Sequence, residues 1–376
     1  IAARLYPAED VGVASAIVSA LSLTFQLSML GMGSAIIRFY PDYGEKAVGS
    51  ALVVTSVASL VISIVYGLIM LTSKSFKELG WGFLGLFVVL SVLETVYNIF
   101  YTYAVARRIA EHAFLQSLLF SGRFLFLVFL ASLGTLGMVI AFGLGLLLAL
   151  GYVMIMVGLP KVMLNGEFLR EALHFSAGNY FAGILNVIPT YLMPTLILSM
   201  LGKEEAAYFY IAFSIGNIIL LVPNAINTSF FVEGSHGLRN IKETLKRAVA
   251  YSYAYLLVAL VGVWLFGGYV LRFFGEGYAG GLPLLRLMVI GGFPAVVVGF
   301  ASTVLNIQKR VRVLMAVNAL RASMFLGLSY LFVPRIGILG VGLGWVGSHF
   351  GALGAMGVMF RKEIQKHISR SVPGEA

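Results

Sequence analysis

The sequence lacks cysteine and is poor in charge. It contains no Cys in 376 residues, and only 11% of its residues are Asp, Glu, Lys or Arg, against about 25% in an ordinary soluble domain. The absence of Cys excludes disulfides, thiolate catalysis and Cys-based metal sites. No Walker A lysine motif, HExxH sequence or hydrolase nucleophile elbow occurs either. The chain does not have the composition of a soluble enzyme.

Long apolar runs take the place of charge. Hydrophobic residues make up 60% of the chain, and the mean hydropathy is +0.95. Apolar stretches of about 20 residues indicate membrane-spanning helices. We predict an all-α integral membrane protein with eleven spans: 9–37, 46–72, 80–106, 111–133, 136–159, 171–200, 204–231, 244–271, 282–305, 311–333 and 337–360. No linker between them is long enough to fold as a soluble catalytic domain.

The basic residues predict the orientation of the spans. The net charge is +10, and most of the 26 Lys and Arg fall in alternate linkers and the C-terminal tail. Basic loops stay in the cytoplasm, which predicts a cytoplasmic C-terminus in a multi-pass protein of the cytoplasmic membrane. The same charge favours contact with anionic membrane lipids rather than with nucleic acid.

The two halves of the chain repeat. Gly134, Gly137 and Ala141 recur as Gly337, Gly340 and Gly344 at a constant offset of 203 residues, and the order of basic loops and glycine turns recurs with them. Parallel repeats of six spans are a transporter layout. We expect two pseudo-symmetric six-helix lobes, residues 1–160 and 161–376, and a twelfth helix before Ile1 to complete the first lobe.

The segment "ARLYPAEDVGVASAIVSALSLTFQLSMLGMGSAIIRFYP" resembles the opening of the polysaccharide-exporter flippases, the O-antigen-type family of the MATE and lipid II flippase (MOP) superfamily. The shared positions are Leu5, Pro7, Glu9, Gly12, Leu30, Gly31, Gly33, Ala35, Arg38 and Phe39. Val11 departs from the aromatic residue usual before that glycine, and the family's first helix, which helps to line its cavity, is expected before Ile1. The resemblance implies a MATE-like fold and transfer of a lipid-linked oligosaccharide across the membrane by alternating access, without an enzymatic reaction or a bound cofactor.

Arg123 and Glu94 fall deep within spans. Arg123 follows Arg108 by 15 residues, and Glu94 precedes Arg107 by 13. At 1.5 Å per residue both lie roughly 20 Å from the cytoplasmic boundary, near the midplane. An ionised side chain there costs about 2.5–3.5 kcal/mol on insertion scales. Two interpretations remain open: an ion pair that holds two helices together, or a polar cavity that binds an anionic headgroup or couples an ion.

Polar residues at helical spacing are candidates for the same cavity. They are carboxamides and one further deep arginine: Gln26, Asn98, Gln116, Asn179, Asn186, Asn217, Asn224 and Arg321. Carboxamides facing one space suit sugars, which need many donors and acceptors. The alternative is polar contact between helices, which contributes about 0.6 kcal/mol per hydrogen bond.

The residues and the resemblance together predict a flippase for a polyprenyl-phosphate- or pyrophosphate-linked oligosaccharide. In this hypothesis Arg123, and Arg321 with it, attracts the phosphate, while Glu94 tunes the site or couples Na⁺ or H⁺. Glycan polymerases or transferases would be its partners. The alternative is a MATE-type Na⁺- or H⁺-coupled exporter of small cations, which predicts a cavity dominated by acidic groups; one deep carboxylate against two deep arginines favours an anionic substrate.

Overall fold

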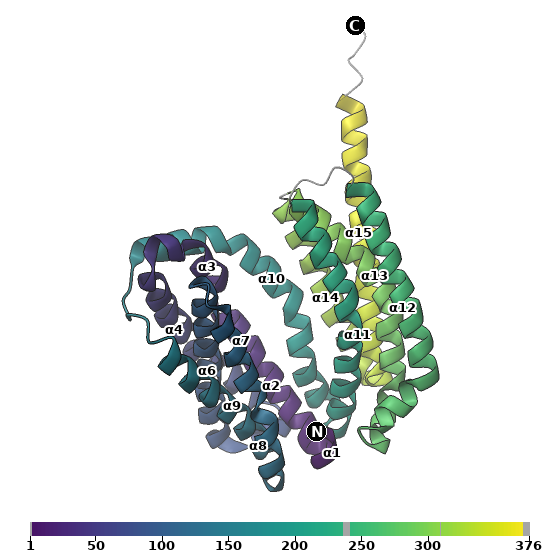
Figure 1. Cartoon of the computed structure of the whole chain (residues 1–376). Coiled ribbons are helices and arrows are strands. Elements are labelled where there is room, and N and C mark those ends of the chain that lie inside the picture. Colours follow the sequence, from purple (N-terminus) through teal and green to yellow (C-terminus); the bar gives the residue numbers. More distant parts are fainter. Residues whose placement is uncertain (1, 236–240, 309, 371–376) are drawn as a thin grey trace. The chain divides into compact units, whose positions relative to one another are not determined.

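The computed structural model describes residues 2–235, 241–308 and 310–370, and these residues form helices and turns but no strand (Figure 1). The elements are α1 (Ala2–Leu5), α2 (Ala8–Ser28), α3 (Met32–Tyr43), α4 (Glu45–Met70), α5 (Lys74–Lys77), α6 (Gly80–Ala106), α7 (Ala110–Ser121), α8 (Arg123–Phe129), η1 (Ala131–Leu133), α9 (Gly134–Met156), α10 (Gly166–Leu201), α11 (Lys203–Ser235), α12 (Ile241–Arg272), η2 (Glu276–Gly281), α13 (Leu282–Ile307), α14 (Val311–Ile336) and α15 (Leu339–Arg370).

Helices occupy all eleven predicted ranges. In the described residues, ten helical segments are long and apolar enough to cross a membrane. The predicted range 337–360 corresponds to α15, which is not among the ten; its first half is rich in glycine and contains His349, which lower its hydropathy. The predicted all-α membrane class is confirmed.

Two predicted spans are interrupted. The range 9–37 is divided between α2 and α3, because Leu30 and Gly31 adopt φ of 47° and 76°. The close approach of α10 accounts for the glycine: a Cβ on Gly31 would lie 2.5 Å from Ser176 Cβ. The range 111–133 is divided at Gly122 into α7 and α8 and ends in η1. Hydropathy alone does not register such breaks, because the residues on both sides are apolar.

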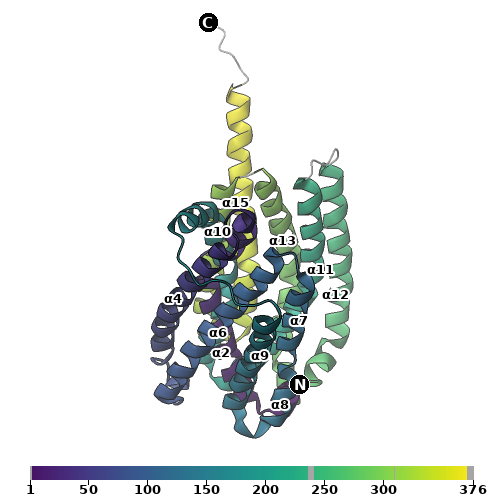
Figure 2. The ribbon, with the colours of Figure 1, turned by 60° about the vertical axis from the view of Figure 1, so that its left-hand side comes forward.

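The chain divides by its internal contacts into unit 1, Ile1–Tyr210, and unit 2, Ile211–Ala376. In unit 1, α4 packs on α6, α2 packs on both, and α7 and α8 pack on α9 (Figure 2). Helix α10 packs along α2 and α3, which places it in unit 1. The predicted lobe boundary after residue 160 rests on the sequence repeat, which these contacts do not test, and it stays a prediction.

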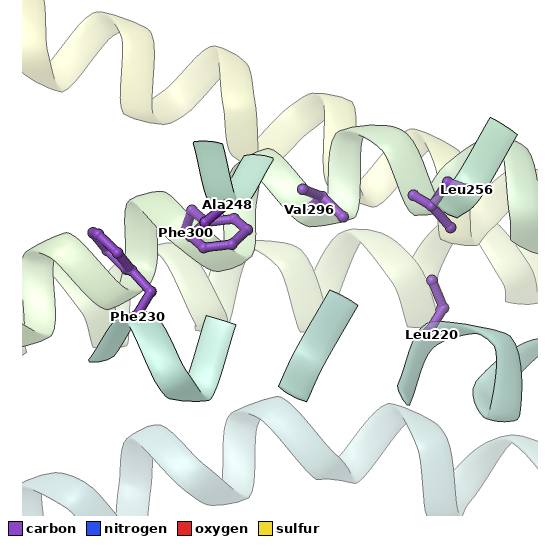
Figure 3. Packing of buried hydrophobic residues seen from close by; sticks show 6 residues of the cluster. All are labelled: Leu220, Phe230, Ala248, Leu256, Val296 and Phe300. Carbon is purple, nitrogen blue, oxygen red and sulfur yellow. The ribbon is translucent and has the colours of Figure 1, made fainter. Parts of the chain in front are cut away.

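Unit 2 is built on the hairpin of α14 and α15, with α13 on α15 and α12 on α13. Figure 3 shows one of its cores, in which Leu220, Phe230, Ala248, Leu256, Val296 and Phe300 come together from α11, α12 and α13. The rings of Phe230 and Phe300 meet edge to face at 5.6 Å. Since lipid is as apolar as these side chains, close packing holds such helices together.

Candidate functional site

Glu94 is the buried acid of unit 1. It lies on α6 with 8% of its surface exposed, and Ser22 of α2 donates a hydrogen bond to its Oε1 at 3.3 Å. Its Oε2 is buried and has no hydrogen-bond partner among the described residues. An acceptor left unpaired in an apolar interior costs free energy. Glu94 is therefore equipped to accept a proton or a cation.

Arg123 is the first residue of α8, directly after the Gly122 break. Its guanidinium carbon lies 3.9 Å from the ring centroid of Phe120, 5.5 Å from that of Phe124 and 5.8 Å from that of Phe142. We call these three residues the Arg123 aromatic cluster. Nη1 also donates to the Phe120 carbonyl at 3.3 Å. Cation–π contacts contribute about 2 kcal/mol when desolvated, so the rings offset part of the cost of burying the cation.

Helix α9 approaches the arginine closely at a glycine. A Cβ on Gly145 would lie 2.8 Å from Arg123 Cβ and 3.0 Å from the Phe120 carbonyl oxygen. Phe142, one turn away on α9, meets Phe120 edge to face at 5.4 Å. The break at Gly122 and the bare backbone of Gly145 thus fix the position of Arg123.

Arg123 and Glu94 are near each other but not in direct contact. The two side chains are close enough to influence each other electrostatically, and so are Arg123 and the hydroxyls of Tyr97 and Tyr210. Within the described residues the ion pairs are Lys203–Glu78, Arg247–Glu243 and Arg272–Glu276. The ion-pair interpretation does not describe this structure, because the arginine contacts aromatic rings and the carboxylate accepts from a serine.

The other predicted polar residues of unit 1 fall into two groups. Gln26 of α2 interacts with the hydroxyl of Tyr191 on α10, which lies within electrostatic range of Glu94. Asn98 donates to the Glu94 carbonyl at 2.9 Å within α6, and the fully buried Gln116 donates to the Tyr97 carbonyl at 2.9 Å. Gln26 joins the polar group around Glu94, whereas Asn98 and Gln116 use their amides on the backbone of α6.

The remaining predicted residues belong to α10, α11 and α14. Asn186 is exposed on α10, and the side chain of Asn179 lies outside the described residues. Asn217 is half-buried and Asn224 exposed, both on α11 in unit 2. Arg321 is half-buried on α14 of unit 2, within electrostatic range of the buried His349 on α15.

The structure adds aromatic residues that the sequence analysis did not select: Phe120, Phe124, Phe142, Tyr191 and Tyr210. The spacing Phe120-x-x-Arg123-Phe124 was the available signal, since residues three apart share a helix face. In a chain where 13% of residues are aromatic, that spacing does not stand out. Only the structure shows which of these rings the Arg123 guanidinium contacts.

Comparison with known proteins shows the fold. No family model and no curated protein matches the chain. Among solved structures, it is similar to the "inward-facing conformation of a multidrug resistance MATE family transporter of the MOP superfamily", with TM-score 0.75 and 16% identity over 98% of this chain and 93% of that one.

It is also similar to "Lipid II flippase MurJ, inward closed conformation", with TM-score 0.77 and 15% identity over 95% of this chain and 83% of that one. A third similar structure is a MOP superfamily transporter from Pyrococcus furiosus Vc1 (DSM3638), described as having a "reverse polarity of binding pocket", with TM-score 0.58 and 17% identity over 96% of this chain and 88% of that one. The chain has the fold of MOP superfamily transporters and flippases and is a multi-pass membrane protein.

Proposed function

We propose that this protein is a flippase that moves a polyprenyl-phosphate- or pyrophosphate-linked oligosaccharide across the cytoplasmic membrane, as O-antigen-type exporters do. The proposal places its C-terminus in the cytoplasm and gives it glycan polymerases or transferases as partners. Surface polysaccharide assembly would be its physiological setting. The similarity to a lipid II flippase supports a lipid-linked substrate.

The single observation that carries the proposal is the state of Arg123. Its guanidinium contacts three aromatic rings and a carbonyl rather than a carboxylate. Cation–π contacts leave the positive charge in place, and a guanidinium forms bidentate hydrogen bonds with phosphate. An arriving phosphate would therefore replace the weak ring contacts of Arg123 by strong hydrogen bonds, and no ion pair would have to break first.

In this proposal Glu94 binds the coupling ion. Its unpaired Oε2, with Oε1 held by Ser22, would take up Na⁺ or H⁺. A change of charge at Glu94 would alter the field at Arg123, since the two side chains interact electrostatically. Ion binding and phosphate binding would then be linked within unit 1.

One observation favours the second candidate, a MATE-type Na⁺- or H⁺-coupled exporter of small cations. Glu94 and the hydroxyls of Ser22 and Tyr191 form an acceptor group that also suits a cationic substrate. The similarity to a multidrug resistance transporter is the same kind of support. The two functions differ in the sign of the substrate's charge.

The test is restoration of surface polysaccharide in a strain that lacks its own flippase, with wild type beside Arg123→Ala and Arg123→Lys at matched membrane abundance. We expect Arg123→Ala to reduce export at least tenfold, because a charge-assisted hydrogen bond contributes about 1.5–3 kcal/mol. Export by Arg123→Lys should lie between that of wild type and that of Arg123→Ala, since lysine keeps the charge but loses the planar guanidinium.

The matched control is Arg286→Ala. Arg286 on α13 also contacts an aromatic ring, with its guanidinium carbon 4.9 Å from the Trp264 centroid, and it has no role in the proposal. Its variant should export normally. Normal export by Arg123→Ala would assign that arginine a structural role. A wild type that exports no glycan but confers resistance to cationic drugs would replace the flippase function by the second candidate.

A further inference from the structure

A cavity of about 250 Å³ lies between the end of α4 and the start of α6 in unit 1. Its lining is apolar apart from Thr72 and one cation, and consists of Leu68, Leu71, Thr72, Lys77, Gly80 and Trp81. The residues on its rim are open to the surroundings: Trp81 is 75% exposed and Leu68 43% exposed. By the predicted topology this end of the two helices is the non-cytoplasmic one.

An apolar stripe on α4 leads to the cavity. It consists of exposed aliphatic side chains at helical spacing, Val57, Leu60, Val61, Ile64, Val65 and Leu68, the last of which lines the cavity. From Val57 to Leu68 the helix rises about 16 Å, close to one leaflet of a hydrocarbon core that is about 30 Å thick. The stripe has the length of a single acyl chain that begins at the cavity.

The charge at the cavity is positive. Lys77 is exposed, and the ion pairs of the described residues do not include it. The adjacent carboxylate, Glu78, is already bound by Lys203 at 2.8 Å. Lys74 adds a second exposed cation on α5 but does not line the cavity. Trp81 beside Lys77 is the residue type that concentrates at membrane interfaces.

We propose that this cavity binds one anionic glycerophospholipid of the surrounding bilayer, with the headgroup phosphate on Lys77 and an acyl chain along the α4 stripe. A zwitterionic lipid would bring a second positive charge beside Lys77 and gain less. A long polyprenyl chain would extend beyond the stripe. The lining of the site includes neither Arg123 nor Glu94, and the proposal does not depend on the transported substrate.

The experiment is native mass spectrometry of the purified, complete protein with phosphatidylglycerol or phosphatidylcholine added in detergent. Wild type should retain phosphatidylglycerol about tenfold more than phosphatidylcholine, in line with one charge-assisted contact. Lys77→Gln should lower phosphatidylglycerol retention by about tenfold. The control Lys74→Gln, which removes the neighbouring cation outside the cavity, should retain it as wild type does. Matched thermal unfolding of the three proteins would verify that each is folded.

Three results would overturn the proposal. The first is unchanged retention of phosphatidylglycerol by Lys77→Gln. The second is an equal loss of retention in Lys74→Gln, which would indicate unspecific attraction. The third is displacement of phosphatidylglycerol by an equal concentration of polyprenyl phosphate, which would assign the cavity to the transported lipid. Because lipid retention is measured without transport, a failure of the lipid proposal would leave the flippase proposal untouched. A failure of the flippase proposal would likewise leave the lipid proposal untouched.

Discussion

At the scale of single residues, the two deep charges of unit 1 are accommodated differently. Arg123 keeps its charge against a ring 3.9 Å away, whereas Glu94 has one oxygen bonded to Ser22 and one without a partner. Burying an isolated carboxylate is expensive. The rings offset part of the cost of burying the arginine, and the acid is left with capacity for a ligand.

This difference makes Glu94→Gln informative. Gln keeps the size of the side chain and can still accept from Ser22, but it cannot change its charge. We expect ion-coupled transport to fall at least tenfold while thermal stability in detergent is unchanged or higher, because no charge is buried. Asn98→Ala, which removes an amide bonded within α6, is the control and should transport normally. Full transport by Glu94→Gln would show that this acid does not carry the coupling ion.

At the scale of elements, unit 1 depends on a helix cap supplied from another helix. Asp10 in the first turn of α2 accepts hydrogen bonds from the Thr135 backbone at 3.0 Å and from the Thr135 hydroxyl at 2.6 Å. These bonds satisfy donors at the start of α9, where Gly134 has φ of 54°. The nearby Tyr6 hydroxyl donates to the Leu127 carbonyl at 2.7 Å. Burial, and secondly the negative charge of Asp10, raises the pKa of the Tyr6 hydroxyl, so the hydroxyl keeps its proton and remains a donor.

We expect Asp10→Ala to destabilise the protein by about 1–2 kcal/mol, the usual cost of a lost cap. The measurement is the unfolding temperature in detergent. Glu9→Ala removes an exposed carboxylate from the same turn of α2 and should leave that temperature nearly unchanged. If both variants behaved alike, the charge of this turn, and not the bond to α9, would be the stabilising feature.

Element positions could largely be predicted from the sequence, because hydrophobic length decides them. The breaks at Gly31 and Gly122 could not. Gly31 is needed where α10 passes within contact distance, and that neighbour lies about 145 residues further along the chain. Depth counting predicted that Arg123 and Glu94 lie at a similar level of the membrane. It could not predict that the guanidinium faces Phe120 rather than the carboxylate, since a side-chain rotamer settles that choice.

At the scale of the whole molecule, the start of α11 forms a close contact with the first part of the chain. A Cβ on Gly12 of α2 would lie against the Lys203 carbonyl oxygen, so the two helices touch through backbone. The Lys203 ammonium also bonds to Glu78, beside α5, at 2.8 Å. Both contacts lie within unit 1, at the end that the predicted topology places outside. If the protein works by alternating access, as proposed, these helices would separate there in the outward-open state.

The absence of cysteine makes that requirement testable. In a variant carrying Glu78→Cys and Lys203→Cys, a bis-maleimide should join only these two positions and should abolish transport, because the end can no longer open. Each single variant should remain active, since an exposed ion pair contributes at most about 1 kcal/mol. The control pair, Glu243→Cys with Arg247→Cys, replaces an ion pair within α12 and should transport normally after the same treatment. Transport that survives complete cross-linking of residues 78 and 203 would mean that the helices stay together at this end throughout the cycle, and the substrate would then need another exit.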